Sequence, residues 1–255
     1  MHKKFGQHFI KNPYYINKIV NSIETPPPAN ILEIGPGKGS ITFPLSEKGY
    51  NLICIEIDKK FEEFLKGNKI FVYYKDALQF PKKIDVFLKE NDISILVSNL
   101  PYSSGTKIFL RYLKYINYLK QMILMFQKEV GEKILANSNS SAFGALSVIT
   151  KTMAEYKIIC QVPPGAFSPK PKVDSILISF KPKEKLNIIY DDFLKFLSNC
   201  FKKPRKTFYN NLIEFYKKNI IEDMYLKFDI EMNVRPHQIS VKKFLEIFNF
   251  LEGIK

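Results

Sequence analysis

The chain has 255 residues, which suits one α/β domain of ordinary size and a smaller appendage. Hydrophobic residues make up 45% of it, so the composition excludes global disorder. Lysine and arginine number 39 against 25 acidic residues. The formal charge of +14 favours a polyanionic partner, although a lysine-rich composition alone gives the same surplus.

The first half of the chain alternates apolar, β-branched runs with segments of helical spacing. The predicted strands are Asn30–Ile34, Asn51–Ile57, Lys69–Tyr74, Ile93–Ser98 and Gln121–Phe126. The predicted helices between them include Ile41–Glu47, Lys60–Lys66 and Lys107–Tyr115. This alternation predicts a parallel sheet whose strands are joined by right-handed crossovers.

The pattern changes after residue 140. Tyr156–Val162 and Ser175–Phe180 are predicted strands, and the segment between them is too short for a helix, so they should pair antiparallel. The result is a mostly parallel seven-stranded sheet with an antiparallel edge strand. Later segments carry apolar residues at helical spacing, namely Asp191–Phe201, Lys206–Tyr216, Ile220–Leu226 and Val241–Leu251. We therefore predict an α/β domain at residues 1–182 and a small all-helical domain at residues 183–255.

The three cysteines, Cys54, Cys160 and Cys200, lie far apart in apolar surroundings and lack the spacing of metal ligands. We expect free, buried thiols in a reducing compartment and no metal site. The first residues form no apolar signal segment, and no run is long and apolar enough to span a membrane. The sequence thus predicts a cytoplasmic protein with no membrane partner.

Polar or small residues follow successive predicted strands. The segment Glu33–Gly39 ends the first strand, and its glycines, among them Gly35 and Gly37, let the backbone approach a ligand closely. Glu56 ends the second strand, where an acid can accept hydrogen bonds from two ribose hydroxyls, and Asp76 ends the third, where it can accept one from an adenine amino group. The glycines and Glu56 alone fit a dinucleotide as well as S-adenosylmethionine.

The tetrapeptide Asn99-Leu100-Pro101-Tyr102 follows the fourth predicted strand. The Asn99 amide and the Leu100 carbonyl, ahead of a rigid proline, can accept the two hydrogens of a planar exocyclic amine, and Tyr102 can stack on the ring that carries this amine. A nicotinamide dinucleotide would need a pyrophosphate site and a hydride acceptor, and the tetrapeptide explains neither. S-adenosylmethionine explains all four strand ends, so the sequence favours methyl transfer to an amine.

With these motifs in order, the sequence resembles the bacterial 16S rRNA adenine N6,N6-dimethyltransferases, the ribosomal RNA small subunit methyltransferase A family. Further matching segments are Phe5–Ile10, Gln127–Val130, Phe143–Val148, Val162–Ser175, Arg205–Thr207, Arg235–Pro236 and Ile239–Val241. The resemblance covers nearly the whole chain. It implies a Rossmann-like class I methyltransferase fold and a monomeric enzyme that uses S-adenosyl-L-methionine to dimethylate N6 of two adjacent adenosines. Its substrate would be 16S rRNA, near the 3′ end, in an immature 30S subunit during ribosome biogenesis.

The resemblance also assigns roles to individual positions. The cofactor-binding positions that it implies, together with the glycine loop, are His8, Ile10, Gly35, Gly37, Glu56, Asp76, Ala77 and Asn99. The implied catalytic positions are Asn99, Leu100, Pro101, Tyr102 and Phe167. In this scheme Tyr102 and Phe167 sandwich the flipped target adenine. Catalysis depends on positioning and needs no general base.

A basic run near the start of a predicted helix is the candidate for contacts with RNA phosphates. It consists of Lys202, Lys203, Arg205 and Lys206. Such a run can instead be an ordinary solvated surface that does not contact RNA. Pro204 interrupts it where the family often has basic residues, which leaves the length of the following helix open.

Two other functions share these motifs. One is a macrolide-resistance methyltransferase that modifies an adenine of 23S rRNA, and it has the same cofactor and amine-binding residues. The segments Val162–Ser175 and Arg235–Val241 favour the small-subunit enzyme. The other is a non-catalytic assembly or transcription factor on the same fold, which predicts an eroded cofactor site. The presence of Glu56, Asp76 and Asn99 speaks against it.

Overall fold

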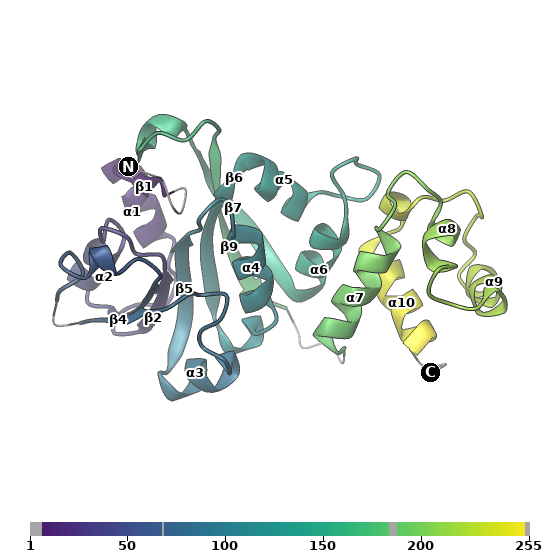
Figure 1. Ribbon diagram of the computed structural model, residues 1–255, viewed down its shortest axis with the longest axis horizontal. Coiled ribbons are helices and arrows are strands. Elements are labelled where there is room, and N and C mark those ends of the chain that lie inside the picture. The colour runs from purple at the N-terminus through teal and green to yellow at the C-terminus, as the bar shows by residue number, and fades with distance from the viewer. Residues whose placement is uncertain (1–6, 68, 184–187, 253–255) are drawn as a thin grey trace. The chain divides into compact units, whose positions relative to one another are not determined.

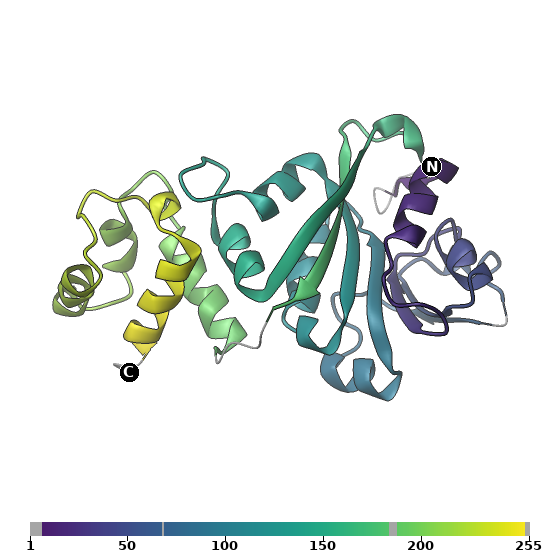
Figure 2. The same ribbon diagram turned by 180° about the vertical axis from the view of Figure 1, so that it is seen from behind.

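A seven-stranded sheet in the order β4-β3-β2-β5-β6-β9-β7 forms the centre of one of two units in the computed structural model (Figures 1 and 2). The strands are β2 (Asn30–Ile34), β3 (Asn51–Glu56), β4 (Ile70–Tyr74), β5 (Ile93–Asn99), β6 (Gln121–Gln127), β7 (Ala154–Val162) and β9 (Ser175–Pro182). The structure describes residues 7–67, 69–183 and 188–252. The first unit contains the described residues up to Gly131 and from Ala154 to Lys183. The second contains Glu132–Met153 and the described residues from 188 onward.

The strand directions confirm the predicted Rossmann-like architecture. Strands β4, β3, β2, β5 and β6 pair in parallel, whereas β9 pairs antiparallel with both β6 and β7. The reversed strand therefore lies one place in from the edge, and β7 forms the edge. The chain runs outward from β2 to β4 and then returns to β5 on the other side of β2. Ligands of open α/β sheets bind beyond the strands' carboxyl ends at such a reversal.

The helices of the first unit are α1 (Pro13–Asn21), α2 (Thr42–Glu47), α3 (Ile84–Glu90) and α4 (Gly105–Leu113), and α5 (Lys128–Leu135) follows β6. One sheet face packs Ile31, Ile95 and Ile123 into an apolar cluster that includes Ile19 of α1. On α4, Phe109 contacts Phe126 with a ring-centroid distance of 5.4 Å. The sheet is thus buried on both faces, as the near-continuous apolar strands predicted.

The second unit is helical and has an aromatic core. Its helices are α6 (Ala145–Met153), α7 (Tyr190–Cys200), α8 (Phe208–Leu212), α9 (Lys218–Lys227) and α10 (Val241–Glu252). In this core the ring centroid of Phe248 on α10 lies 5.0 Å from that of Phe193 and 5.5 Å from that of Phe196, both on α7. Helix α6 packs against α7 and α10, so residues 132–153 group with these helices, whereas the sequence placed them in the first domain.

Helix α8 is shorter than the predicted segment Lys206–Tyr216. Its N-cap is Thr207, whose side chain accepts a hydrogen bond from the Asn210 N–H at 3.2 Å. Residues 203–206 form turns instead of a first helical turn. The cap at Thr207 explains the later start, because a threonine whose side chain accepts from an N–H of the first turn marks where the helix begins.

Two further properties concern the described residues. No helix in ranges 7–67, 69–183 and 188–252 has the length and apolar character needed to cross a membrane. The three cysteines are free thiols, of which Cys54 and Cys200 are buried and Cys160 is partly exposed.

Candidate active site

A cleft lies at the carboxyl ends of β2, β3, β4 and β5. It encloses about 800 Å³ of empty space, the open solvent at its mouth included. Most of the predicted cofactor-binding and catalytic residues line it, namely His8, Gly35, Gly37, Glu56, Asp76, Ala77, Asn99, Leu100, Pro101 and Tyr102. The sequence did not single out Ile57, Lys75 or Ile108, which also line the cleft. The sequence could have indicated Ile57 as a lining residue, because this large apolar residue directly follows the acid at the end of a predicted strand.

The glycine loop after β2 has the backbone conformation that glycine permits. Gly35 has φ +70° and Gly37 has φ +55°, both in the left-handed region. A Cβ on Gly37 would lie 2.5 Å from the Phe9 ring, so a side chain there is excluded. A Cβ on Gly35 would meet no atom within 4 Å. The backbone at Gly35 is therefore open to a ligand, which fits the predicted approach of a cofactor.

Glu56 connects the end of β3 to this loop. Its side chain is buried, with 3% exposure, and accepts hydrogen bonds from the Gly37 N–H and the Asp58 N–H, both at 3.0 Å. Burial raises the pKa of Glu56, and these N–H donors oppose the rise. Each carboxylate oxygen has capacity for a second hydrogen bond, so the residue can hold the loop and still accept from a ligand's hydroxyls.

A second acid lies behind the glycine loop. Glu33, on β2, is 1% exposed, and its Oε2 has no hydrogen-bond partner among the described residues. Burial raises the pKa of Glu33 to about 8, and the negative charge of Glu56 adds to the rise. The folded protein therefore holds Glu33 as a neutral acid at pH 7, which avoids a buried, unpaired charge.

Glu33 predicts a specific pH dependence of stability. Between pH 4.5 and about 8 the folded state keeps a proton that the unfolded state has lost. The free energy of unfolding should therefore fall as the pH rises through this window, by up to about 1.4 kcal/mol per pH unit. In Glu33→Gln the part of this dependence that Glu33 contributes should disappear, and the variant should exceed the wild type in stability at pH 8. Urea unfolding at pH 5, 6, 7 and 8 measures the effect.

The control for this experiment is Glu47→Gln, because Glu47 is an exposed acid on α2. It should follow the wild-type pH dependence. Parallel pH curves for Glu33→Gln and the wild type would contradict a neutral Glu33.

Asn99 is the last residue of β5, and its side chain turns into the cleft. Its Nδ2 donates a hydrogen bond to the His8 carbonyl at 2.8 Å. Since the amide nitrogen is engaged there, Oδ1 is the atom left to accept from a ligand. The next residues leave the strand at once, because the Pro101 carbonyl accepts from the Gly105 N–H at 2.7 Å and so starts α4.

Tyr102 is half-buried at the mouth of the cleft. Its ring centroid lies 5.2 Å from that of His8, with an interplanar angle of 34°. The His8 Nδ1 donates to the Pro169 carbonyl at 2.7 Å, which fixes the imidazole in this place. Tyr102 thus forms an aromatic pair with His8, a contact that the sequence did not predict.

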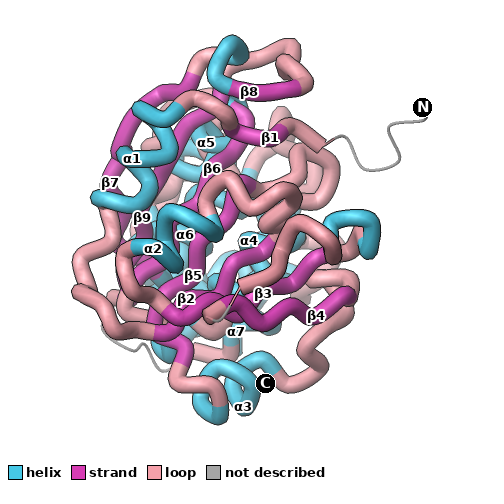
Figure 3. The backbone as a smooth tube through the Cα atoms, turned by 90° about the vertical axis from the view of Figure 1, so that its left-hand side faces the viewer, coloured by secondary structure: helices cyan, strands magenta, loops and turns pink. Residues whose placement is uncertain are grey.

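Ile10 and Phe167 do not reach the cleft. They face each other in the short antiparallel pair of β1 (Phe9–Ile10) and β8 (Phe167–Ser168) (Figure 3). Ile10 is 1% exposed and Phe167 is 2% exposed, within the apolar cluster of the sheet. The pairing of β1 with β8 thus holds the Phe167 ring in the core in this conformation, and its stacking on a base stays a prediction. The matching residues Phe5 and Gly6 lie outside the described part of the chain.

The four predicted RNA-binding residues lie on an exposed turn of the second unit. The turn is fixed by Asn211, which is 1% exposed. The Asn211 Oδ1 accepts from the Lys203 N–H at 2.7 Å, and its Nδ2 donates to the carbonyls of Lys203 and Thr207 at 3.1 and 3.0 Å. This buried amide presents the side chains of residues 202–206 to solvent.

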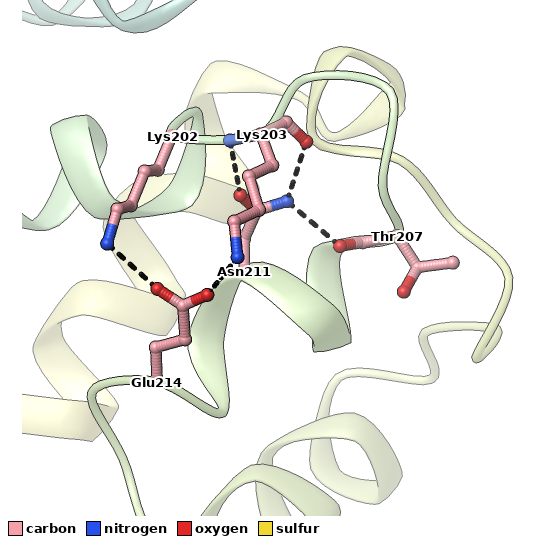
Figure 4. Close-up of polar contacts among 5 residues, drawn as sticks. All are labelled: Lys202, Lys203, Thr207, Asn211 and Glu214. Carbon is pink, nitrogen blue, oxygen red and sulfur yellow. Dashed lines mark hydrogen bonds and ion pairs between the residues drawn. The ribbon is translucent and has the colours of Figure 1, made fainter.

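Two of these basic side chains already have an acidic partner. Lys202 forms an ion pair with Glu214 at 2.8 Å, and Lys203 forms a second ion pair with the other oxygen of the same carboxylate (Figure 4). These contacts lower the pKa of Glu214 to about 2. Arg205 and Lys206 form no ion pair within the described residues. In the described ranges, no group of three or more His, Cys, Asp or Glu side chains is arranged to hold a metal ion.

Comparisons with known proteins agree over the full length. The sequence pattern of the family described as "Ribosomal RNA adenine dimethylase" matches residues 1–253. The ribosomal RNA small subunit methyltransferase A of Malacoplasma penetrans is 36% identical over 254 residues, covering 98% of this chain and 92% of the relative. That of Legionella pneumophila (strain Corby) is 34% identical over 261 residues, covering 98% of both.

Solved structures give the same result. A dimethyladenosine transferase from Plasmodium falciparum superimposes with a TM-score of 0.78 at 26% identity, covering 94% of this chain and 96% of that one. The 23S rRNA methyltransferase ErmE superimposes with a TM-score of 0.68 at 20% identity, covering 96% and 99%, and shows the shared fold. The class I methyltransferase fold predicted from the sequence is thus confirmed, and the chain belongs to the ribosomal RNA adenine dimethylase family.

Proposed function

We propose that this rRNA adenine dimethyltransferase transfers methyl groups from S-adenosyl-L-methionine to N6 of two adjacent adenosines near the 3′ end of 16S rRNA. Its substrate is an immature 30S subunit in the cytoplasm, and it acts as a monomer in ribosome biogenesis. The observation that carries the proposal is a shared cleft, in which Asn99-Leu100-Pro101-Tyr102 meets the glycine loop and Glu56. The relatives named for the small subunit support the choice of 16S rRNA.

The cleft fits the cofactor at each strand end. The open backbone at Gly35 suits its methionine part, and the buried Glu56 carboxylate suits the two ribose hydroxyls. Asp76 accepts from the Leu78 N–H at 2.8 Å through Oδ1, so its Oδ2 remains to accept from the adenine amino group. Ala77 and Ile57 supply apolar contacts beside it. The bound cofactor supplies an electrophilic methyl group.

Asn99 and Leu100 would act on the target base. The N6 lone pair of adenine is delocalised into the ring, so the amine is a poor nucleophile. Hydrogen bonds from this amine to Asn99 Oδ1 and to the Leu100 carbonyl favour a pyramidal nitrogen, and they stabilise the positive charge that develops there. The alkylated nitrogen loses its proton readily, so no general base is assigned. Tyr102 stacks on the flipped base, which offsets part of the cost of unstacking.

We assign RNA phosphate binding to the turn that carries Lys202, Lys203, Arg205 and Lys206. Its exposure and its fixed backbone on Asn211 support this assignment. Lys202 and Lys203 both form ion pairs with Glu214 in the free protein, so RNA phosphates have to displace the Glu214 carboxylate from these lysines. Contacts of this kind make affinity depend on salt concentration.

Glu214→Gln should therefore bind RNA about 3- to 10-fold more tightly at low salt. It should also show a steeper salt dependence, because the lysines released from Glu214 neutralise further RNA phosphates and displace their condensed cations, at a slope of about 0.7–0.9 per phosphate. Fluorescence anisotropy with a labelled 16S fragment at several salt concentrations measures both effects. Glu222→Gln is the control, since Glu222 pairs with Lys218 on α9. Unchanged affinity in Glu214→Gln, with tighter binding in the control, would contradict the assignment.

A labelled-methyl assay tests the proposed function directly. The chain should transfer label from S-adenosylmethionine to immature 30S particles and not to protein-free 23S rRNA. Transfer to 23S rRNA alone would assign the chain to the resistance-type enzymes. Because Glu56, Asp76 and Asn99 are all present in the cleft, we expect cofactor binding in calorimetry. Its absence would instead indicate a non-catalytic factor.

A further inference from the structure

Tyr102 is tied to the sheet by a hydroxyl that the predicted site did not include. The Tyr102 Oη and the Ser175 Oγ are 2.6 Å apart. Ser175 is the first residue of β9 and is completely buried. In the ladder it pairs with Gln127 of β6 on one side and with Val162 of β7 on the other. Its hydroxyl is therefore a fixed point of the sheet, whereas Tyr102 lies in the turn between β5 and α4.

The face of the same ring is restrained separately. His8 lies against Tyr102 at a centroid distance of 5.2 Å, and its Nδ1 donates to the carbonyl of Pro169 in the segment that leads into β9. The Ser175 hydroxyl thus fixes the tip of the Tyr102 ring, and His8 restrains its face. A half-buried tyrosine held at two points keeps one orientation instead of several rotamers.

We propose that Ser175 is a positioning residue for methyl transfer, whose hydroxyl sets the orientation of the Tyr102 ring on which the target adenine stacks. The inference rests on the proposed function, because it needs a base in the cleft. A misaligned ring would still give stacking surface but would hold the amine away from Asn99 for part of the time. Since reaction requires a near-attack arrangement, the loss should appear in kcat more than in KM.

A double-mutant cycle tests this inference in the full-length chain. The variants are Ser175→Ala, Tyr102→Phe and the two combined, assayed with immature 30S particles and S-adenosylmethionine. Each single variant should lower kcat by about 5- to 20-fold, with KM and cofactor affinity within 2-fold of the wild type. The double variant should be no slower than the slower single one, because both substitutions remove the same hydrogen bond.

A matched control lies on the same strand. Ser179 is also a nearly buried serine of β9, and its Oγ accepts from Gln121 Nε2 at 2.8 Å, among residues that do not line the cleft. Ser179→Ala should leave kcat within 2-fold of the wild type. An equal drop in kcat for Ser179→Ala and Ser175→Ala would overturn the inference, because it would show a general effect of losing a buried hydroxyl from β9.

A second pair of variants covers the case in which Ser175→Ala does not fold. Ser175→Thr and Ser175→Val have nearly the same shape and differ in the hydroxyl, so the threonine variant should retain several-fold more activity. Independent, multiplicative losses in the cycle, or equal activity of the Thr and Val variants, would overturn the role of Ser175 while leaving the proposed function standing. A wild type that binds cofactor but methylates no rRNA would overturn the proposed function and this role with it.

Discussion

Asn99→Ala should lower kcat by about 100-fold or more while RNA affinity stays within 2-fold of the wild type. The expected size follows from loss of one preorganised group aimed at the charge that develops in the transition state. In the proposed mechanism Asn99 Oδ1 is that group, because Nδ2 is engaged by the His8 carbonyl. Cofactor affinity should fall by less than 10-fold, since Glu56 and the glycine loop are untouched. Single-turnover methylation of 30S particles, anisotropy and calorimetry measure the three quantities.

The matched control for this prediction is Asn17→Ala on the exposed side of α1, in the same unit and outside the cleft. It should leave all three quantities unchanged. An equal loss of turnover and RNA binding in Asn99→Ala would contradict its assigned role, because it would show that Asn99 acts in substrate binding.

The second large effect is expected from Glu56→Gln, which should weaken S-adenosylmethionine binding by about 100-fold or more. A hydrogen bond to a charged group contributes about 1.5–3 kcal/mol, and in the proposed function the carboxylate accepts from two ribose hydroxyls. An amide in its place also directs an N–H₂ group toward the N–H of Gly37 or Asp58, which disturbs the glycine loop. Isothermal calorimetry of cofactor binding, with RNA binding measured in parallel, tests the prediction.

The pH dependence supplies a second readout for Glu56. Because burial raises the pKa of Glu56, the carboxylate gains a proton earlier than an exposed one as the pH falls. Wild-type cofactor affinity should therefore decline as the pH is lowered toward this raised pKa, and Glu56→Gln should lack that decline. Glu47→Gln is the control, since Glu47 is an exposed acid on α2 that does not line the cleft. An unchanged affinity in Glu56→Gln would refute the assigned contact.

Much of the fold and most of the cleft were predictable from the sequence. The strands of a parallel sheet are buried on both faces, so Ile31, Ile95 and Ile123 belong to continuous apolar runs with clear ends. The residues that follow those ends meet at one edge of the sheet. This is why Glu56, Asp76 and Asn99 could be placed in one site before the structure was known.

The parts that were missed depend on contacts between distant residues. The resemblance implied that Phe167 stacks on a base, but its pairing with Ile10, far earlier in the chain, buries it. Local patterns carry no information about such pairing. The bond between Tyr102 and Ser175 joins residues 73 positions apart and was equally hidden. The ion pairs of Glu214 were closer in sequence, but they depend on a turn whose backbone the Asn211 side chain holds.

The most direct test of the central claim is mass spectrometry of small-subunit RNA after incubation of immature 30S particles with this protein and labelled S-adenosylmethionine. The proposed function predicts N6,N6-dimethyladenosine at two adjacent positions near the 3′ end of 16S rRNA, and its absence with Asn99→Ala. Two results would contradict it. One is unmodified 16S rRNA although the protein binds the cofactor, and the other is label in 23S rRNA alone.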